Sequence, residues 1–130
     1  MIAQIWQDIV YCTSYTFKTL GEAYEAYPIG IVFREIPDDI PAGTGYNLET
    51  DTLVANDVLI KHRSNEIAER KEAVEQDYLS ALKAIRKGDT SKDWEARATA
   101  IEAYLDALDA VLSQAGYPIT VEWPEYPTKP

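Results

Sequence analysis

Two stretches of helical periodicity between Ser64 and Gly116 constrain the fold of this chain more than any other feature. In the first stretch, apolar residues recur at spacings of seven, four, four and three and share one side of a helix: Ile67, Val74, Tyr78, Leu82 and Ile85. The matching stripe of the second stretch is Trp94, Ala98, Ile101, Leu105, Leu108 and Leu112. A short connector forces such helices to run antiparallel. We therefore expect a long αα-hairpin with helices over about 64–87 and 91–115.

The ends of both helices carry recognisable signals. Ser64 or Asn65 is the expected N-cap of the first helix, which begins at Ser64 or up to eight residues earlier. Gly88 is suited to the left-handed conformation that ends a helix, and Thr90 or Ser91 is the expected N-cap of the second.

The residues before the hairpin have a mixed pattern. The segments "QIWQDIVYCTSYTF", "IGIVFREI" and "TLVAND" have the composition of strands. "TLGE" matches a capping box that opens a short helix, and "PDDIPAGTGYNLETD" is typical of turns. The predicted fold class is α+β: a small mixed, β-rich region over 1–57, then over 58–130 a helical hairpin with a short C-terminal strand or extended tail. A lone hairpin is one layer and must cover its second face with that region, a second copy or a partner.

Composition excludes several classes of protein. An apolar fraction of 46% in 130 residues is enough for a packed core. The formal net charge of −10 disfavours nucleic acid as a partner, because phosphate binding depends on clustered Lys and Arg. No apolar run approaches the length of a membrane span, and the first ten residues lack the basic segment of a signal peptide.

The residues that catalysis or metal binding requires are sparse. The chain has one histidine, His62, which lies between two cations and is expected to be solvated, and one cysteine, Cys12, expected to be a small buried side chain. Asp38 and Asp39 are expected to solvate a loop, and "GTG" lacks the lysine of a phosphate-binding loop. The sequence therefore predicts a protein that is not an enzyme and uses no metal or cofactor.

The segment "YPITVEWPEYPTKP" is the most distinctive part of the chain. Its β-branched run predicts a strand over 119–122, and the prolines that follow favour a stiff, extended trace. Such a segment either packs on its own hairpin or anchors a partner. The candidate binding residues are Trp6, which is either core or interface, and Trp123, Pro124, Tyr126 and Pro127.

Residues 66–127 resemble the C-terminal region of bacteriophage tail fibre assembly proteins. In that family, a Trp with an Arg three residues later precedes an ending similar to W-P-x-x-P. Trp94 and Arg97 match the first part, and the second part is matched by Pro118, Val121, Trp123, Pro124 and Pro127.

The resemblance implies a non-catalytic chaperone that binds a trimeric tail fibre protein in the host cytoplasm and in some members stays in the virion. A homo-oligomer is a further expectation. Two alternatives stay open: a permanent baseplate or fibre component, and a receptor-binding tip whose sugar site uses tyrosines and acids of residues 1–55.

Overall fold

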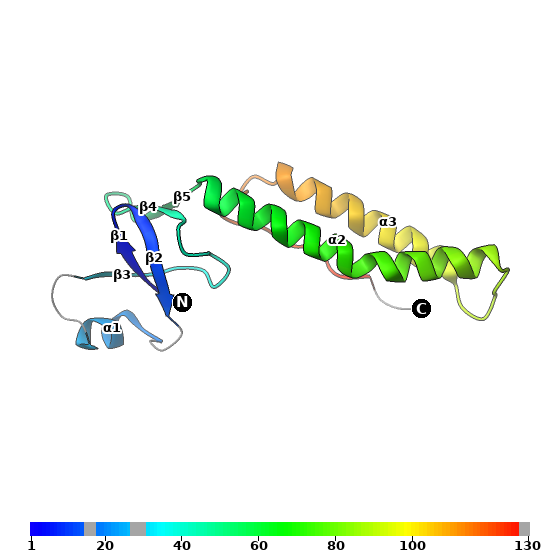
Figure 1. Ribbon diagram of the computed structural model, residues 1–130, viewed down its shortest axis with the longest axis horizontal. Coiled ribbons are helices and arrows are strands. Elements are labelled where there is room, and N and C mark those ends of the chain that lie inside the picture. Colours follow the sequence, from blue (N-terminus) through cyan, green and yellow to red (C-terminus); the bar gives the residue numbers. More distant parts are fainter. Residues whose placement is uncertain (15–17, 27–30, 128–130) are drawn as a thin grey trace. The chain divides into compact units, whose positions relative to one another are not determined.

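The computed structural model describes residues 1–14, 18–26 and 31–127, with only the backbone of 12–14, and it divides into two compact units (Figure 1). The sheet unit is Met1–His62 and the hairpin unit is Arg63–Pro130. The expected α+β class is confirmed. The units divide after His62 rather than after residue 57, because the first turns of α2 (Asp57–Arg86) belong to the sheet unit, where Leu59 is fully buried.

An antiparallel sheet forms most of the sheet unit. Its strand order is β3-β1-β2-β4-β5. The strands are β1 (Ile2–Trp6), β2 (Ile9–Ser14), β3 (Val32–Glu35), β4 (Gly45–Asn47) and β5 (Thr52–Val54). The expected strands in "IGIVFREI" and "TLVAND" are therefore confirmed as β3 and β5.

Two details of the sheet were not expected. The stretch "QIWQDIVYCTSYTF" has the composition of a strand, but its described part contributes to two strands, β1 and β2, which form a hairpin. The turn residues Gln7 and Asp8 have φ of 51° and 63°. Such a two-residue turn matches the twist of the strands and usually contains Asn-Gly, a signal that this sequence lacks. The predicted turn region likewise contains β4, which pairs with β5 from Gly45–Val54 to Asn47–Thr52.

A short helix, α1 (Leu20–Ala26), packs on the sheet. The first half of the expected capping box is confirmed, since the Glu22 N–H donates to Thr19 Oγ1 at 3.2 Å. The Glu22 carboxylate accepts from the N–H of Lys18, one residue before Thr19, at 2.9 Å. Ala23 of this helix belongs to a core cluster with Ile2 and Phe33. The other buried apolar side chains of the unit include Ile5, Val10, Ile36, Ile40, Tyr46 and Leu59.

The predicted hairpin is confirmed, with α2 followed by α3 (Trp94–Ala110) and a 3-10 turn at Val111–Ser113. The expected N-caps are wrong. Asn56 accepts from the Leu59 N–H at 3.2 Å, and Asp93 accepts from the Ala96 N–H at 3.0 Å. Because α2 begins seven residues before Ser64, which is within the expected range, Ser64 and Asn65 lie in its interior.

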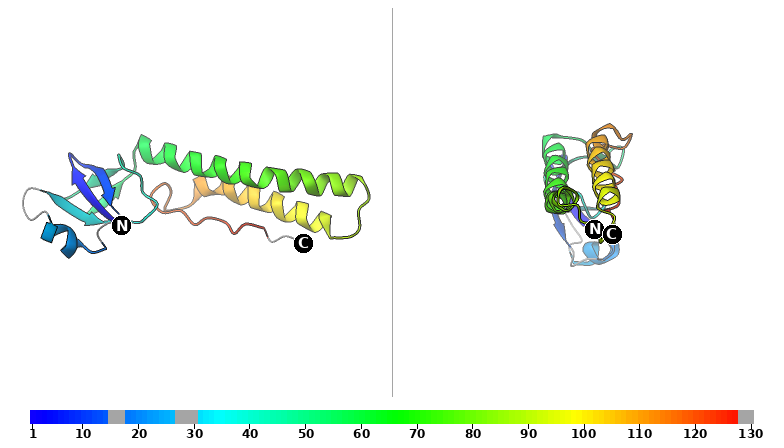
Figure 2. Two further views of the ribbon diagram at one scale, coloured as in Figure 1. Left: turned by 60° about the horizontal axis from the view of Figure 1, so that its bottom comes forward. Right: turned by 90° about the vertical axis from the view of Figure 1, so that its right-hand side faces the viewer.

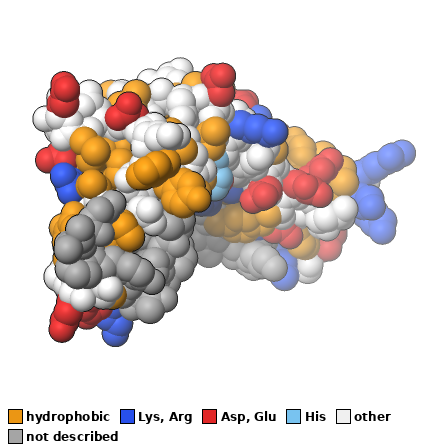
Figure 3. Space-filling model, turned by 60° about the vertical axis from the view of Figure 1, so that its left-hand side comes forward, with side chains coloured by type: hydrophobic (Ala, Val, Ile, Leu, Met, Phe, Trp, Pro, Cys, Tyr) orange, Lys and Arg blue, Asp and Glu red, His pale blue; other side chains and the backbone are white. Residues whose placement is uncertain are grey.

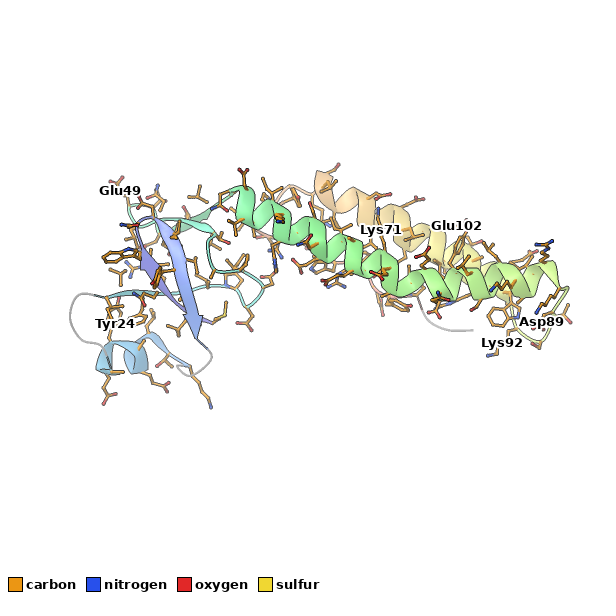
Figure 4. The ribbon with its side chains drawn as sticks, in the orientation of Figure 1. Tyr24, Glu49, Lys71, Asp89, Lys92 and Glu102 are labelled. Carbon is orange, nitrogen blue, oxygen red and sulfur yellow. The ribbon has the colours of Figure 1, made fainter. Side chains whose placement is uncertain are left out.

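The connector begins as predicted. Gly88 has φ of 72°, its N–H donates to the Ile85 carbonyl, and the Asp89 N–H donates to the Ala84 carbonyl. This pair of bonds is the Schellman arrangement, which satisfies the last carbonyls of α2. Figure 4 shows Asp89 and Lys92 in the connector, at one end of the hairpin.

The hairpin core consists of Ile67, Val74, Ile101, Tyr104, Leu108 and Val111. Two residues of the predicted stripes are exposed: Leu82 by 40% and Leu112 by 55%. Ala81, Tyr104 and Val111 are buried although they were outside those stripes. Within the described residues, no helix is long and apolar enough to cross a membrane.

Candidate functional site

The C-terminal arm, defined here as residues 121–127, runs along the hairpin (Figure 2). The strand predicted over 119–122 is wrong: residues 115–119 are turn and 121–127 carry no regular structure. The physical reason is the side chain of Gln114. Its amide donates to the Glu122 carbonyl at 2.7 Å and accepts from the Glu122 N–H at 2.8 Å, so one side chain fills the place of a partner strand.

The root of the arm is held by a buried arginine. The side chain of Arg63 on α2 is 0% exposed. It donates from Nε to the Pro118 carbonyl at 2.7 Å and from a terminal nitrogen to the Ile119 carbonyl at 2.9 Å. Its other terminal nitrogen lies 2.9 Å from a carboxylate oxygen of Glu66. A guanidinium suits this position because its planar fork presents several donors at once.

Trp123 is the first aromatic residue of the arm, and it contacts α2 through Arg70. The Arg70 guanidinium carbon is 4.1 Å from the centroid of its ring, within the range of a cation–π contact. Trp123 and Val121 also pack against the hairpin core. The Trp123 side chain is therefore half-buried within its own chain.

Tyr126 occupies a second, more polar position. Its hydroxyl donates to a carboxylate oxygen of Asp77 at 2.6 Å, and its ring lies edge-on to Tyr104 at 5.6 Å between centroids. The hydrogen bond to Asp77, and then burial, raise the pKa of the Tyr126 hydroxyl. Arg97, which is 4% exposed, connects Asp77 with the end of the arm. One terminal nitrogen of its guanidinium lies 3.0 Å from an Asp77 carboxylate oxygen, and the other donates to the Pro127 carbonyl at 2.5 Å.

These contacts decide between the two readings of the arm. Trp123, Pro124 and Pro127 are half-buried on their own hairpin, and Tyr126 is 42% exposed. The arm therefore packs in cis. A hollow of about 430 Å³ remains beside the arm. One wall is formed by residues of α3, namely Ala100, Ala103, Tyr104 and Ala107, and the other by residues 124–127 of the arm.

Trp6, the remaining candidate, is exposed. Its side chain is 52% accessible at the end of β1. The strand register pairs Trp6 with Ile9, Ile9 with Gly45, and Gly45 with Val54. Directly paired residues lie on one face of an antiparallel sheet, so this register makes an apolar row from β1 to β5. We call Trp6, Ile9 and Val54 the apolar row.

The two edges of the sheet differ. On β3, the Phe33 N–H donates to the Tyr24 hydroxyl at 3.0 Å, and that hydroxyl donates to the Phe33 carbonyl at 3.2 Å, so Tyr24 covers this edge (Figure 4). Among the described residues, no backbone group bonds to the β5 backbone except through its pairing with β4. Figure 3 shows hydrophobic side chains gathered on the sheet unit in the foreground.

A second hollow lies beside the end of the row. It measures about 430 Å³ and is lined by Asp8, Tyr46, Asn47, Leu48, Glu49 and Val54. Glu49 is at the tip of the β4–β5 hairpin (Figure 4). Burial raises the pKa of the Tyr46 hydroxyl above its ordinary value.

The groups weighed for catalysis were His62, Cys12 and the Asp38–Asp39 pair. His62 on α2 is half-buried rather than solvated as expected, and the side chain of Cys12 is outside the described residues. Asp38, 80% exposed, is 3.0 Å from the Met1 amino nitrogen. No group of three potential metal ligands is present in the part of the chain that the structure describes.

Several residues of the arm site were missed or left without a role by the sequence reasoning. Arg97 entered only through the family motif, and Arg63, Asp77 and Gln114 were not singled out. An arginine on the stripe side of a helix is a usable signal. Arg63 precedes Ile67 by four residues, and Arg97 precedes Ile101 by four, so both face the core.

Comparison with known proteins returns no counterpart: no family model, curated protein or solved structure matches this chain.

Proposed function

We propose that this chain is a non-catalytic assembly chaperone that binds a phage tail fibre protein through the apolar row and the open edge of β5. The observation that carries the proposal is the row of Trp6, Ile9 and Val54, which ends at an edge strand with exposed residues. The family resemblance of residues 66–127 supplies the identity of the client.

The chemistry of the row suits a β-rich client. A fibre polypeptide that has not yet trimerised presents strand edges, and such edges aggregate unless they are covered. An edge strand with free backbone groups can pair with one of them, while exposed apolar side chains on one face provide anchors. Trp6 is the strongest anchor, because tryptophan is enriched among residues that dominate binding energy.

The test is co-expression with a trimeric phage tail fibre protein as the client. We expect the wild-type chain to raise the yield of soluble trimeric fibre. Trp6→Ala, and Val54→Lys at the edge, should each reduce that yield several-fold, because they remove the anchor or block edge pairing. Tyr11→Ala is the matched control: Tyr11 is 58% exposed and is skipped by the β1–β2 register, so it lies outside the row.

Two results would contradict the proposal. One is equal fibre yield with and without the chain, and the other is full activity of both row variants. Retention of the chain in purified virions would favour the permanent fibre or baseplate component over a released chaperone.

The hollow beside Tyr46 favours a second candidate, a receptor-binding tip. An aromatic ring with amide and carboxylate groups is a common lining for a sugar site. Binding of the isolated protein to a glycan array, lost in Glu49→Ala, would support this candidate.

A further inference from the structure

We infer that the groove under the arm is a binding site for the arm of a second copy of this chain, so that two copies can associate by exchanging residues 121–127. This inference is independent of the proposed function, since it concerns the hairpin unit and a different ligand.

The groove recognises specific groups of the arm. It offers the Arg70 guanidinium to an indole, the Asp77 carboxylate to a phenol hydroxyl, and Arg97 to a main-chain carbonyl. These contacts select an extended segment with an aromatic ring and a tyrosine three residues apart. The arm of another copy carries this chemistry, and it presents the same groups in the same order.

The apolar surface under the arm is buried only while an arm covers it. Val121 and Trp123 pack against the buried hairpin cluster, and Tyr126 covers Tyr104, which is 5% exposed. An arm that left without replacement would expose this apolar surface to water. Replacement by an identical arm restores every contact, which is why exchange of identical elements is a low-cost route to dimers.

Exchange can begin only after residue 120, because hydrogen bonds hold residues 118–120 on their own hairpin. Arg63 binds the carbonyls of Pro118 and Ile119, and the Thr120 N–H donates to the Gly116 carbonyl at 2.8 Å. The root is therefore tied to its own hairpin. The arm beyond it is seven residues long and spans at most about 25 Å when extended. The hollow of about 430 Å³ at its side gives an incoming arm room to enter.

The tethered arm competes with any arm from another copy. A short tether gives it an effective concentration on the order of millimolar. We therefore expect the wild-type chain to be monomeric at about 100 µM, because the tethered arm is favoured about tenfold at that concentration. Exchange becomes measurable once closure of each chain on itself is weakened.

A complementation experiment meets this condition. The arm variant, Trp123→Ala with Tyr126→Ala, keeps its groove, and the groove variant, Arg70→Glu, keeps its arm. Sedimentation velocity of the 1:1 mixture at about 100 µM should show a heterodimer, because self-closure is weakened in both variants, whereas each variant alone stays monomeric. A synthetic peptide of residues 119–127 in excess should dissociate the heterodimer.

The control is Lys71→Glu in place of Arg70→Glu. Lys71 is the next residue on α2, but its ammonium group pairs with Asp109 of α3 and not with the arm (Figure 4). Its own groove stays filled by its own arm, so it should form no heterodimer with the arm variant. Should the double arm variant lose its helical circular dichroism signal, Tyr126→Ala alone takes its place.

Three results would overturn arm exchange. They are a mixture that stays monomeric, a heterodimer that forms equally well with Lys71→Glu, and dimers of either variant alone. The last result would locate the contact outside the arm and its groove.

Discussion

The hairpin unit buries two arginines, Arg63 and Arg97, whereas the buried polar residue among the described residues of the sheet unit is Thr44. The difference follows from how the backbone hydrogen-bonding groups of each unit are satisfied. In the hairpin unit, a segment without regular structure lies on two helices, and its carbonyls need donors that the helix backbones do not offer. In the sheet unit, neighbouring strands satisfy the backbone, and apolar side chains fill the core. The two buried guanidinium groups are therefore found where a segment without regular structure needs donors for its carbonyls.

The largest expected effect tests the role of buried charge in the hairpin unit. Arg63→Ala removes the donors to Pro118 and Ile119 and leaves Glu66 without this partner. We expect a loss of about 3–5 kcal/mol in the free energy of unfolding, measured by urea denaturation. The exposed Lys61→Ala, two residues earlier, should change it by less than about 0.5 kcal/mol. Similar values for the two variants would mean that the arm root does not depend on the guanidinium.

The next effect compares two leucines of α3. Leu108 is 0% exposed, so Leu108→Ala should cost about 2–5 kcal/mol. Leu105 is half-buried beside a hollow of about 500 Å³ on the hairpin, and Leu105→Ala should cost about 1–2 kcal/mol, since the loss scales with buried area. Thermal and urea unfolding of both variants checks the order. A larger loss at Leu105 would mean that this side is covered in solution.

A third prediction tests the tight backbone packing of the sheet unit. A Cβ on Gly45 would lie 2.8 Å from the Val54 carbonyl oxygen, so Gly45→Ala must displace β5. We expect a loss of about 1–3 kcal/mol, as for other overpacked sites. Gly21 in α1 has its nearest neighbour at 3.7 Å, and Gly21→Ala should stabilise the unit by about 0.5–1 kcal/mol. A neutral Gly45→Ala would show that β5 shifts freely.

The smallest effect concerns pH and the arm. Tyr126→Phe removes the hydrogen bond to Asp77 and should cost about 0.5–1.5 kcal/mol at neutral pH. Because folding raises the Tyr126 pKa above its ordinary value of 10.0, the stabilisation is complete below pH 10 and is lost as pH rises through the higher folded value. Wild type and Tyr126→Phe should therefore converge in stability above pH 10. A gap that persists at high pH would contradict this assignment.

Local chemistry made much of the molecule predictable. The 3.6-residue periodicity of the stripes that contain Ile67 and Ile101 indicated both long helices. Gly88 marked the end of α2, and Thr19 marked the start of the short helix α1. These signals act over a few residues, so they can be recognised without knowing the fold. The β1–β2 turn lacked such a signal, because Gln7 and Asp8 adopt positive φ without a glycine.

The sequence by itself determined that this chain contains a long hairpin, a β-rich region and a stiff aromatic ending. Only the tertiary structure decided where that ending lies and that Trp6 is exposed. Whether Trp123 faces its own chain depends on Arg70, 53 residues earlier, and the exposure of Trp6 depends on a register that joins four strands. Contacts between residues so far apart leave no local pattern in the sequence, because they arise only when the chain has folded.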